Sequence, residues 1–315
     1  MIVRGVPGRR PLERIVEAYL LACRTEGMSP NTVRWYDQKL SAFLSHLGEM
    51  GISPLMSAVK PDVVREFLAS LQGLGRTSFT TRGYVQVLKG FGTWLAEEGY
   101  VTTNPLGHLR LPKVPKYVVK PLSAADVAGL LGAVNPRSAH GARDLAILLL
   151  LLDTGMRLGE LARMTAAEAE GAVRDGLFRV MGKGSRERYL PLGKATRDAL
   201  RRYLHVHRPE AATELLFVSQ GGYPLAAEAL RQVIRRLARR AEVDAVHPHR
   251  LRHTFAANYI ANGGDAMTLQ RILGHSTLEM VRRYVALDSR EIMARHSQAS
   301  PGDRFWRMKG LRKTA

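Results

Sequence analysis

The sequence has a single cysteine, no long apolar run and comparatively few acidic residues, and each absence excludes a class of protein. With Cys23 alone, neither an internal disulfide nor a zinc finger can form. The longest apolar run, residues 145–152, is too short to span a bilayer, and the N-terminus carries no long apolar signal segment. No acidic cluster suits magnesium, and no His/Cys spacing suits zinc. We therefore expect a soluble cytoplasmic protein without metal, cofactor or membrane partner.

Basic residues outnumber acidic ones by a wide margin. The chain holds 47 Lys and Arg against 28 Asp and Glu, which gives a formal charge of +19. The excess is spread along the whole chain rather than gathered in one tail. Such a distributed positive field is typical of proteins that enclose a polyanion, because each basic side chain at a phosphate releases a counterion. Since ribosomal and chromatin proteins share this property, the charge alone predicts only a nucleic-acid partner.

The first third of the chain has the pattern of a helical domain. Amphipathic spacing predicts helices over residues 11–22, 29–51, 60–73 and 81–99. We expect this domain over residues 1–105, and the proline-rich, basic segment that follows as a linker over residues 106–120. Proline lacks a backbone donor and fixes its own dihedral angle, so the segment from Val101 to Pro121 should be extended. Lys113 and Lys116 are its candidate contacts to a phosphate backbone.

The second domain is expected over residues 121–290, followed by a tail over residues 291–315. It opens with a helix for which Ser123 is the candidate cap, and the apolar run 145–152 predicts a buried helix. Alternating residues within 171–192 predict two or three strands of a small antiparallel sheet, and helices resume from about Lys194. The expected fold class is therefore mainly α, with a helical N-terminal domain and a mixed α/β C-terminal domain.

A later helix carries a row of arginines, RQVIRRLARR, mostly on one face. Either this face is simply solvated or it contacts phosphate groups directly. The candidate DNA contacts on it are Arg231, Arg235 and Arg239.

Four motifs together hold a set of residues able to break a phosphodiester without a metal. In chain order they are TGMRLGEL with Arg157, GKGSRER with Lys183, HPHRLRH, and LGHSTLEMVRRYV with His275 and Tyr284. The reaction requires a stabilised phosphate charge, an aligned nucleophile, and proton transfer to and from the reacting oxygens. Guanidinium groups stay charged and bind phosphate in a bidentate fork, which suits the first task. Each motif by itself is weak evidence for this chemistry, whereas the occurrence of all four in this order is strong evidence.

Every element of the set also has an ordinary structural interpretation. Glu160, three residues after Arg157, could buttress that arginine or form a routine ion pair. Lys183 on a predicted turn could protonate a leaving oxygen or only protect an edge strand. Tyr284 could be a nucleophile or a half-buried aromatic residue.

The HPHRLRH motif contains two histidine–arginine pairs with the same spacing. These are His247 with Arg250 and His249 with Arg252, and either could place an imidazole and a guanidinium one helical turn apart. The apolar Leu251 and the following HTFAANYI indicate that Arg252 opens a helix with an apolar second face.

The four motifs resemble those of the tyrosine recombinase family, which includes the phage integrases and the Xer recombinases. The resemblance covers essentially the whole chain, and the Leu-Arg-His of the third motif selects His249 and Arg252. SPNTVRWYDQKLSAFLSHL is similar to the family's core-DNA-binding domain. The resemblance thus implies a SAM-like core-binding domain followed by the catalytic domain, without the separate arm-site-binding domain of larger phage integrases.

The resemblance also implies a mechanism without metal, cofactor or ATP. Tyr284 would attack the scissile phosphate to give a 3′-phosphotyrosine and a free 5′-hydroxyl. Arg157 and Arg252 would clamp the phosphate, and Lys183 would protonate the leaving oxygen. His249 would act as base and hydrogen-bond donor, His275 would bind the phosphate, and Glu160 would support the site.

The partners implied are double-stranded recombination sites, a homotetramer on two duplexes, and a directionality or accessory protein. Residues 291–315 could pack in trans on a neighbouring protomer. Chromosome dimer resolution and integration or excision of a mobile element both fit. The alternatives are a type IB topoisomerase-like relaxase and a catalytically silent DNA-binding protein.

Overall fold

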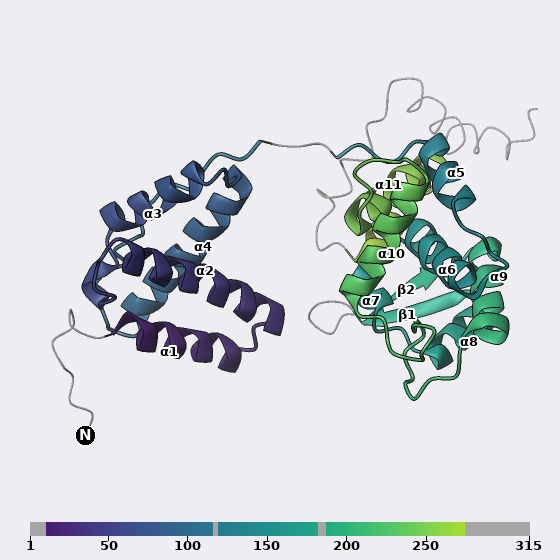
Figure 1. The fold of residues 1–315 in the computed structure, drawn as a ribbon, viewed down its shortest axis with the longest axis horizontal. Helices are drawn as coiled ribbons and strands as arrows, with labels where there is room; N and C mark the ends of the chain where they lie inside the picture. Colours follow the sequence, from purple (N-terminus) through teal and green to yellow (C-terminus); the bar gives the residue numbers. More distant parts are fainter. Residues whose placement is uncertain (1–10, 116–118, 182–186, 275–315) are drawn as a thin grey trace, which may run out of the picture. The chain divides into compact units, whose positions relative to one another are not determined.

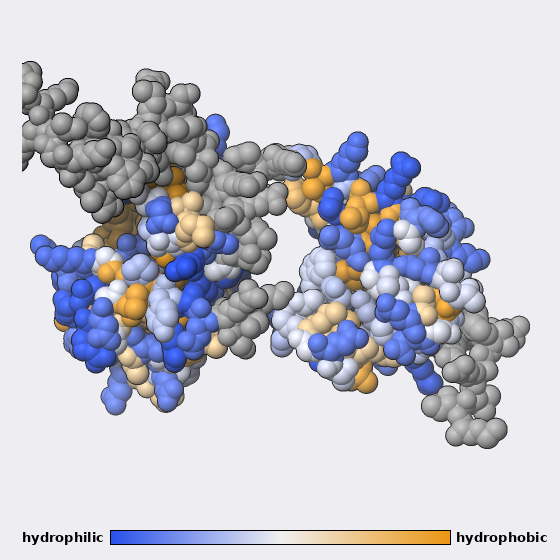
Figure 2. All heavy atoms as spheres, turned by 180° about the vertical axis from the view of Figure 1, so that it is seen from behind, coloured by the Kyte–Doolittle hydropathy of each residue, from blue (hydrophilic) through white to orange (hydrophobic). Residues whose placement is uncertain are grey.

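The chain forms two compact units, residues 1–117 and 118–315, each built around its own hydrophobic core. The computed structural model describes residues 11–115, 119–181 and 187–274 (Figure 1). On the face seen in Figure 2, hydrophilic residues cover much of both units. No helix within the described ranges is long and apolar enough to cross a membrane.

The described part of the first unit is helical. Its elements are α1 (Leu12–Thr25), α2 (Pro30–Glu49), the 3-10 turn η2 (Met56–Ala58), α3 (Pro61–Gly73) and α4 (Ser78–Glu97). Ser29 caps α2 by accepting a hydrogen bond from the Thr32 amide, and Pro30 occupies the first turn, as predicted. The helix predicted from residue 81 begins earlier, because Thr77 caps α4 through the Thr80 amide.

The core of the first unit extends into the segment that was expected to be an extended linker. Leu106 and Leu109 are buried with the residues of the four helices, whose core also contains Cys23. The Lys89 ammonium on α4 donates to the carbonyls of Gly107 at 2.6 Å and Leu109 at 2.9 Å. Residues 105–108 form a turn instead of extended chain, because Leu106 and the nearby Leu109 reach the apolar core.

The second unit combines helices with a two-stranded sheet in its described part. Its helices are α5 (Ala124–Gly132), α6 (Ala139–Thr154), α7 (Leu158–Leu161), α8 (Ala166–Asp175), α9 (Lys194–Arg202), the π-helical turn η3 (Tyr203–His207), α10 (Ala227–Arg240), α11 (Pro248–Ala261) and α12 (Ala266–Leu273). Ser123 caps α5 in a reciprocal capping box with Asp126, which confirms the predicted start. The apolar run 145–152 lies in α6, which runs between α11 and α9 (Figure 1).

The sheet is an antiparallel hairpin of β1 (Leu177–Met181) and β2 (Glu187–Pro191), paired from Leu177 with Pro191 to Met181 with Glu187. The predicted alternation is confirmed, since buried and exposed residues alternate along both strands. The prediction that the strand region begins at residue 171 is wrong, because residues 171–175 form the last part of α8. A capping box between Thr165 and Glu168 starts that helix, and Gly176 ends it in the left-handed conformation at φ +70°.

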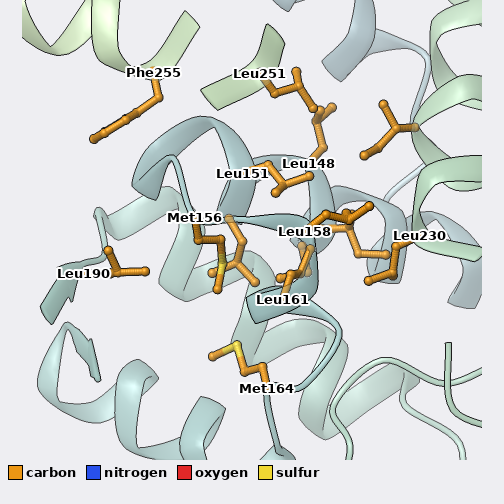
Figure 3. Packing of buried hydrophobic residues seen from close by; sticks show 14 of the residues in the cluster. Leu148, Leu151, Met156, Leu158, Leu161, Met164, Leu190, Leu230, Leu251 and Phe255 are labelled. Atoms are coloured by element: carbon orange, nitrogen blue, oxygen red, sulfur yellow. The ribbon is translucent and has the colours of Figure 1, made fainter. Parts of the chain in front are cut away.

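The core of the second unit lies around α6 and the turn that follows it. Leucines from α6 meet residues of α7, β2, α10 and α11 in one cluster (Figure 3). Met156, Leu158 and Leu161 are buried there, so the chain that leaves α6 is held on both sides of Arg157. This packing fixes the backbone on which the first predicted catalytic arginine stands.

Candidate active site

The turn after α6 projects Arg157 from an otherwise buried segment. Gly155 ends α6 in the left-handed conformation at φ +59°, and a Cβ there would lie 2.3 Å from Cδ1 of Phe255. Glycine is required for both reasons, since other residues rarely adopt this conformation and none could avoid that contact. The Arg157 side chain itself is 46% exposed. The side chain is therefore partly open to solvent, although the residues on either side of it are buried.

Glu160 on α7 holds Arg157 in this position. One carboxylate oxygen, Oε2, accepts the backbone N–H of Arg157 at 2.7 Å, and Oε1 accepts from its Nη1 at 3.1 Å. Arg188 on β2 binds the same carboxylate from the other side, with Nη1 at 2.9 Å from Oε1 and Nη2 at 2.6 Å from Oε2. Burial alone would raise the pKa of Glu160, yet these hydrogen bonds hold its pKa below the usual range. Glu160 is therefore a buried carboxylate kept ionised by two arginines.

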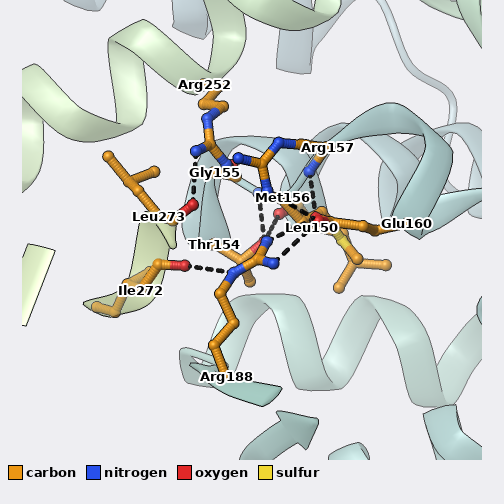
Figure 4. Close-up of polar contacts among 10 residues, drawn as sticks. All are labelled: Leu150, Thr154, Gly155, Met156, Arg157, Glu160, Arg188, Arg252, Ile272 and Leu273. Carbon is orange, nitrogen blue, oxygen red and sulfur yellow. Dashed lines mark hydrogen bonds and ion pairs between the residues drawn. The ribbon is translucent and has the colours of Figure 1, made fainter. Parts of the chain in front are cut away.

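Arg252 on α11 reaches the same turn from a third direction. Its Nη1 donates to the carbonyl of Gly155 at 2.6 Å, and its Nη2 donates to the carbonyl of Leu273 at 2.7 Å. The residue is 7% exposed. Figure 4 shows the guanidinium groups of Arg157, Arg188 and Arg252 converging on one place between α7, β2 and α12. Such a concentration of positive charge beside a single carboxylate is suited to an anion.

The start of α11 separates the two histidine–arginine pairs of the HPHRLRH motif. His247 is the N-cap, and its Nδ1 accepts the Arg250 N–H at 3.1 Å. The Arg250 side chain donates to the carbonyls of Lys120 at 3.0 Å and Asp244 at 2.7 Å, away from the arginine cluster. His249 is exposed in the first turn. The expectation that Arg252 opens the helix is wrong, because this cap lets α11 begin at Pro248.

Three predicted catalytic residues, Lys183, His275 and Tyr284, lie outside the described residues, as does Lys116. The described structure reaches two of the segments that carry them. β2 begins at Glu187, four residues after Lys183, and α12 ends at Leu273, two residues before His275.

The predicted DNA-contact residues on α10 lie opposite its apolar face. Arg231 and Arg235 approach the carboxylate of Glu228, the latter at 4.0 Å, and Arg239 is exposed. Arg236, from the same row, instead pairs with the buried Asp144. Lys113 is exposed near the C-terminal end of the first unit. The basic face of α10 thus combines solvated charge with at least one structural ion pair.

Arg188 was missed by reasoning from the sequence, where it was one more basic residue of GKGSRERYLPL. The signal was its register: Arg188 lies two residues before Leu190 and therefore on the same, buried face of β2. An arginine on the buried face of a strand requires a buried anionic partner. Which carboxylate met it could not be read from the sequence, because Glu160 lies 28 residues earlier.

Comparison with known proteins identifies the class to which this fold and site belong. Residues 120–291 match the phage integrase family, and residues 16–99 match the phage integrase N-terminal SAM-like domain. The chain is 30% identical over 296 residues to the tyrosine recombinase XerD of Staphylococcus aureus (strain Mu50), covering 92% of this chain and 99% of the relative. It is 31% identical over 300 residues to the tyrosine recombinase XerC of Oceanobacillus iheyensis, covering 92% and 97%.

Solved structures share the fold. A Tn1549 transposon integrase in complex with a circular intermediate DNA aligns with a TM-score of 0.72 at 19% identity, covering 91% of this chain and 99% of that one. A lambda integrase dimer bound to a COC′ core site aligns with a TM-score of 0.70 at 19% identity, covering 88% and 78%.

The chain therefore belongs to the phage integrase family. It is a tyrosine-type site-specific DNA recombinase, and neither the topoisomerase-like nor the catalytically silent alternative is favoured.

Proposed function

We propose that this recombinase cuts and rejoins DNA through a 3′-phosphotyrosine at Tyr284, within a site built on Arg157, Arg252 and Glu160. The observation that supports the proposal most is the convergence of Arg157 and Arg252 on the turn at Gly155. Two guanidinium groups lie there, and the side chain of Arg157 is about half exposed. A phosphate placed between them would have its nonbridging oxygens stabilised as charge develops in the transition state.

The two arginines would divide the phosphate contacts by their exposure. Arg157 can rotate its exposed guanidinium onto a phosphate while Glu160 holds its backbone. Arg252 is buried and donates to two carbonyls, so its guanidinium would meet the phosphate without rotating. This arrangement makes Arg252 the rigid member of the clamp and Arg157 the adaptable one.

The remaining steps are assigned to the residues of the matching motifs. The Tyr284 oxygen would attack phosphorus after His249 accepts its proton, and the bond from phosphorus to the 5′ oxygen would break. Lys183 would protonate that departing oxygen, and His275 would donate to the phosphate. Attack by a 5′-hydroxyl on the phosphotyrosine reverses the sequence, so the energy of the broken bond is retained and ATP is not required.

Strand exchange would take place between two DNA duplexes in a homotetramer. Support comes from a fold neighbour described as a lambda integrase tetramer bound to a Holliday junction, aligned with a TM-score of 0.69 at 19% identity. In this assembly residues 291–315 would pack on a neighbouring protomer, and a directionality or accessory protein would be a further partner. The basic face of α10 with Arg231, Arg235 and Arg239, together with Lys113 and Lys116, would contact DNA phosphates.

The test is the formation of a covalent protein–DNA adduct. Duplexes bound by the protein would first be selected from a random-sequence library and nicked beside the protected centre, so that the cleaved fragment diffuses away and the adduct accumulates. We expect an adduct with the parent protein and none with Tyr284→Phe, since the variant lacks the attacking oxygen. An adduct that survives in Tyr284→Phe would remove Tyr284 from the role of nucleophile.

Arg157→Ala tests the phosphate clamp on the same duplex. Because the role is to stabilise charge that develops in the transition state, we expect cleavage to fall by about 100-fold or more while the Kd for the duplex changes little. Arg163→Ala, an exposed arginine just beyond α7, is the matched control and should cleave at the parental rate. Near-normal cleavage by Arg157→Ala would exclude it from the site.

A further inference from the structure

Arg188 on β2 connects separate segments that surround the site. Its Nη atoms bind both oxygens of Glu160, the residue that holds Arg157. Its Nε donates to the carbonyl of Ile272 at 2.8 Å, in the last turn of α12. In the sequence, Arg188 follows Lys183 by five residues, and Ile272, whose carbonyl it binds, precedes His275 by three. One side chain therefore ties together the segments on which the proposed catalytic groups stand.

The hydrogen-bond partners and the packing around Arg188 match the shape of an arginine side chain. The residue is 8% exposed, and the hydrogen bonds at Nε, Nη1 and Nη2 all end on buried partners. Its carbon chain passes over Gly274, where a Cβ would lie 3.0 Å from Cδ of Arg188. A lysine could supply neither the planar fork for Glu160 nor the separate Nε donor for Ile272.

A second arginine holds the neighbouring carbonyl of the same helix end. Arg252 donates to Leu273 while Arg188 donates to Ile272. The last turn of a helix has carbonyls without partners inside the helix, and cationic donors there satisfy them. The end of α12, two residues before His275, is thus held by one arginine that belongs to the proposed phosphate clamp and one that does not.

We propose that Arg188 is a positioning residue for DNA cleavage: it aligns the Arg157–Glu160 pair with the end of α12 and does not touch the phosphate. This inference rests on the proposed function and adds a residue to it. Without Arg188, Glu160 would keep Arg157 as its remaining cationic partner, and the end of α12 would lose one of its two arginine contacts. The phosphate clamp and the end of α12 would then no longer be held in a fixed position relative to each other.

The chain offers a closely matched control for the loss of a buried arginine. Arg143 on α6 is 5% exposed, binds the carboxylate of Asp144 through Nε at 3.2 Å and Nη2 at 3.0 Å, and donates Nη1 to the carbonyl of Val218 at 3.1 Å. Asp144 retains Arg236 if Arg143 is lost, as Glu160 would retain Arg157. Arg143→Met and Arg188→Met therefore each remove two hydrogen bonds to a buried carboxylate and one to a backbone carbonyl, but only Arg188 lies at the site.

The first measurement is single-turnover cleavage at saturating duplex, with the Kd measured separately. For Arg188→Met we expect cleavage to slow by about 100-fold, with a Kd within about threefold of the parent, because the lost geometry matters in the transition state. Arg188→Lys should restore part of the rate, and Arg143→Met should cleave at the parental rate. Equal losses in Arg188→Met and Arg143→Met would show that Arg188 is only structural and would overturn the proposal.

Hydrogen exchange on the full chain without DNA tests the same idea independently of catalysis. We expect Arg188→Met to accelerate amide exchange about tenfold in peptides that cover residues 155–161 and 269–274, and Arg143→Met to leave both peptides unchanged. Unchanged exchange in Arg188→Met would overturn the proposal whatever the activity. If exchange changes as expected but the parent protein forms no adduct, the alignment by Arg188 stands and the proposed cleavage chemistry fails.

Discussion

At the scale of single residues, the site depends on Gly155 as much as on its charged groups. This residue ends α6, supplies a carbonyl to Arg252, and lies against Phe255. Its missing side chain lets α11 approach the turn that carries Arg157. A change of one methyl group at this position should therefore affect both stability and catalysis.

We predict that Gly155→Ala lowers the free energy of unfolding of the second unit by about 3 kcal/mol, from left-handed strain and from overpacking against Phe255. Gly263→Ala separates these causes, because Gly263 also has a positive φ, +88°, but has nothing within 4 Å of its would-be Cβ. It should cost about 1 kcal/mol, the strain alone. Urea unfolding measures both, and equal losses in the two variants would contradict the packing argument.

At the scale of elements, the N-terminus of α11 is held by a titratable cap. Nδ1 of His247 accepts the Arg250 amide, which requires the neutral imidazole. Burial, with the nearby His249 and Arg250, lowers the pKa of His247 below its ordinary value. The helix that carries His249 and Arg252 therefore has a start that weakens when this cap takes up a proton.

We predict that the free energy of unfolding of the second unit decreases as the pH falls from about 6.5, because His247 has a lower pKa in the folded state than in the unfolded state. The unfolded state therefore binds the proton more readily, and the loss is complete once the pH is below the folded pKa. Above that range the contribution of the cap, about 1 kcal/mol, is fully present. His247→Asn keeps a capping side chain that does not titrate. Urea unfolding at pH 7.5 and pH 5 should show a smaller loss for the variant than for the parent. Equal losses would mean that His247 contributes nothing to the acid sensitivity.

At the scale of the whole molecule, the chain has two cores that share no residue. Leu88 is fully buried in the first and Leu130 in the second. Each core is large enough to support a cooperative transition of its own.

We predict two thermal transitions by calorimetry. Leu88→Ala should lower the midpoint of one of them and Leu130→Ala the midpoint of the other, since each leaves a cavity that costs about 2–5 kcal/mol. A common shift of a single transition by both variants would show that the two units unfold as one.

Local patterns predicted most of the elements. Ser29 and Ser123 act as caps, the apolar run 145–152 lies in a buried helix, and the hairpin alternates as expected. The incorrect predictions had two different causes. Leu106 and Leu109 pack into a core that also contains residues of α1 to α4, and this packing is not visible in the local pattern. The start of α11 at Pro248 instead depends on a local contact, the cap formed by His247.

The sequence by itself determined the class of chemistry and the elements that carry it, because ordered catalytic motifs, caps and hydrophobic periodicity are local properties of the chain. Only the tertiary structure decided which charges meet. It placed Arg188 on Glu160, put Arg252 on the carbonyls of Gly155 and Leu273, and turned Arg250 away to Lys120. These pairings join residues 20 or more positions apart. They follow from how helices and strands pack, which no local pattern encodes.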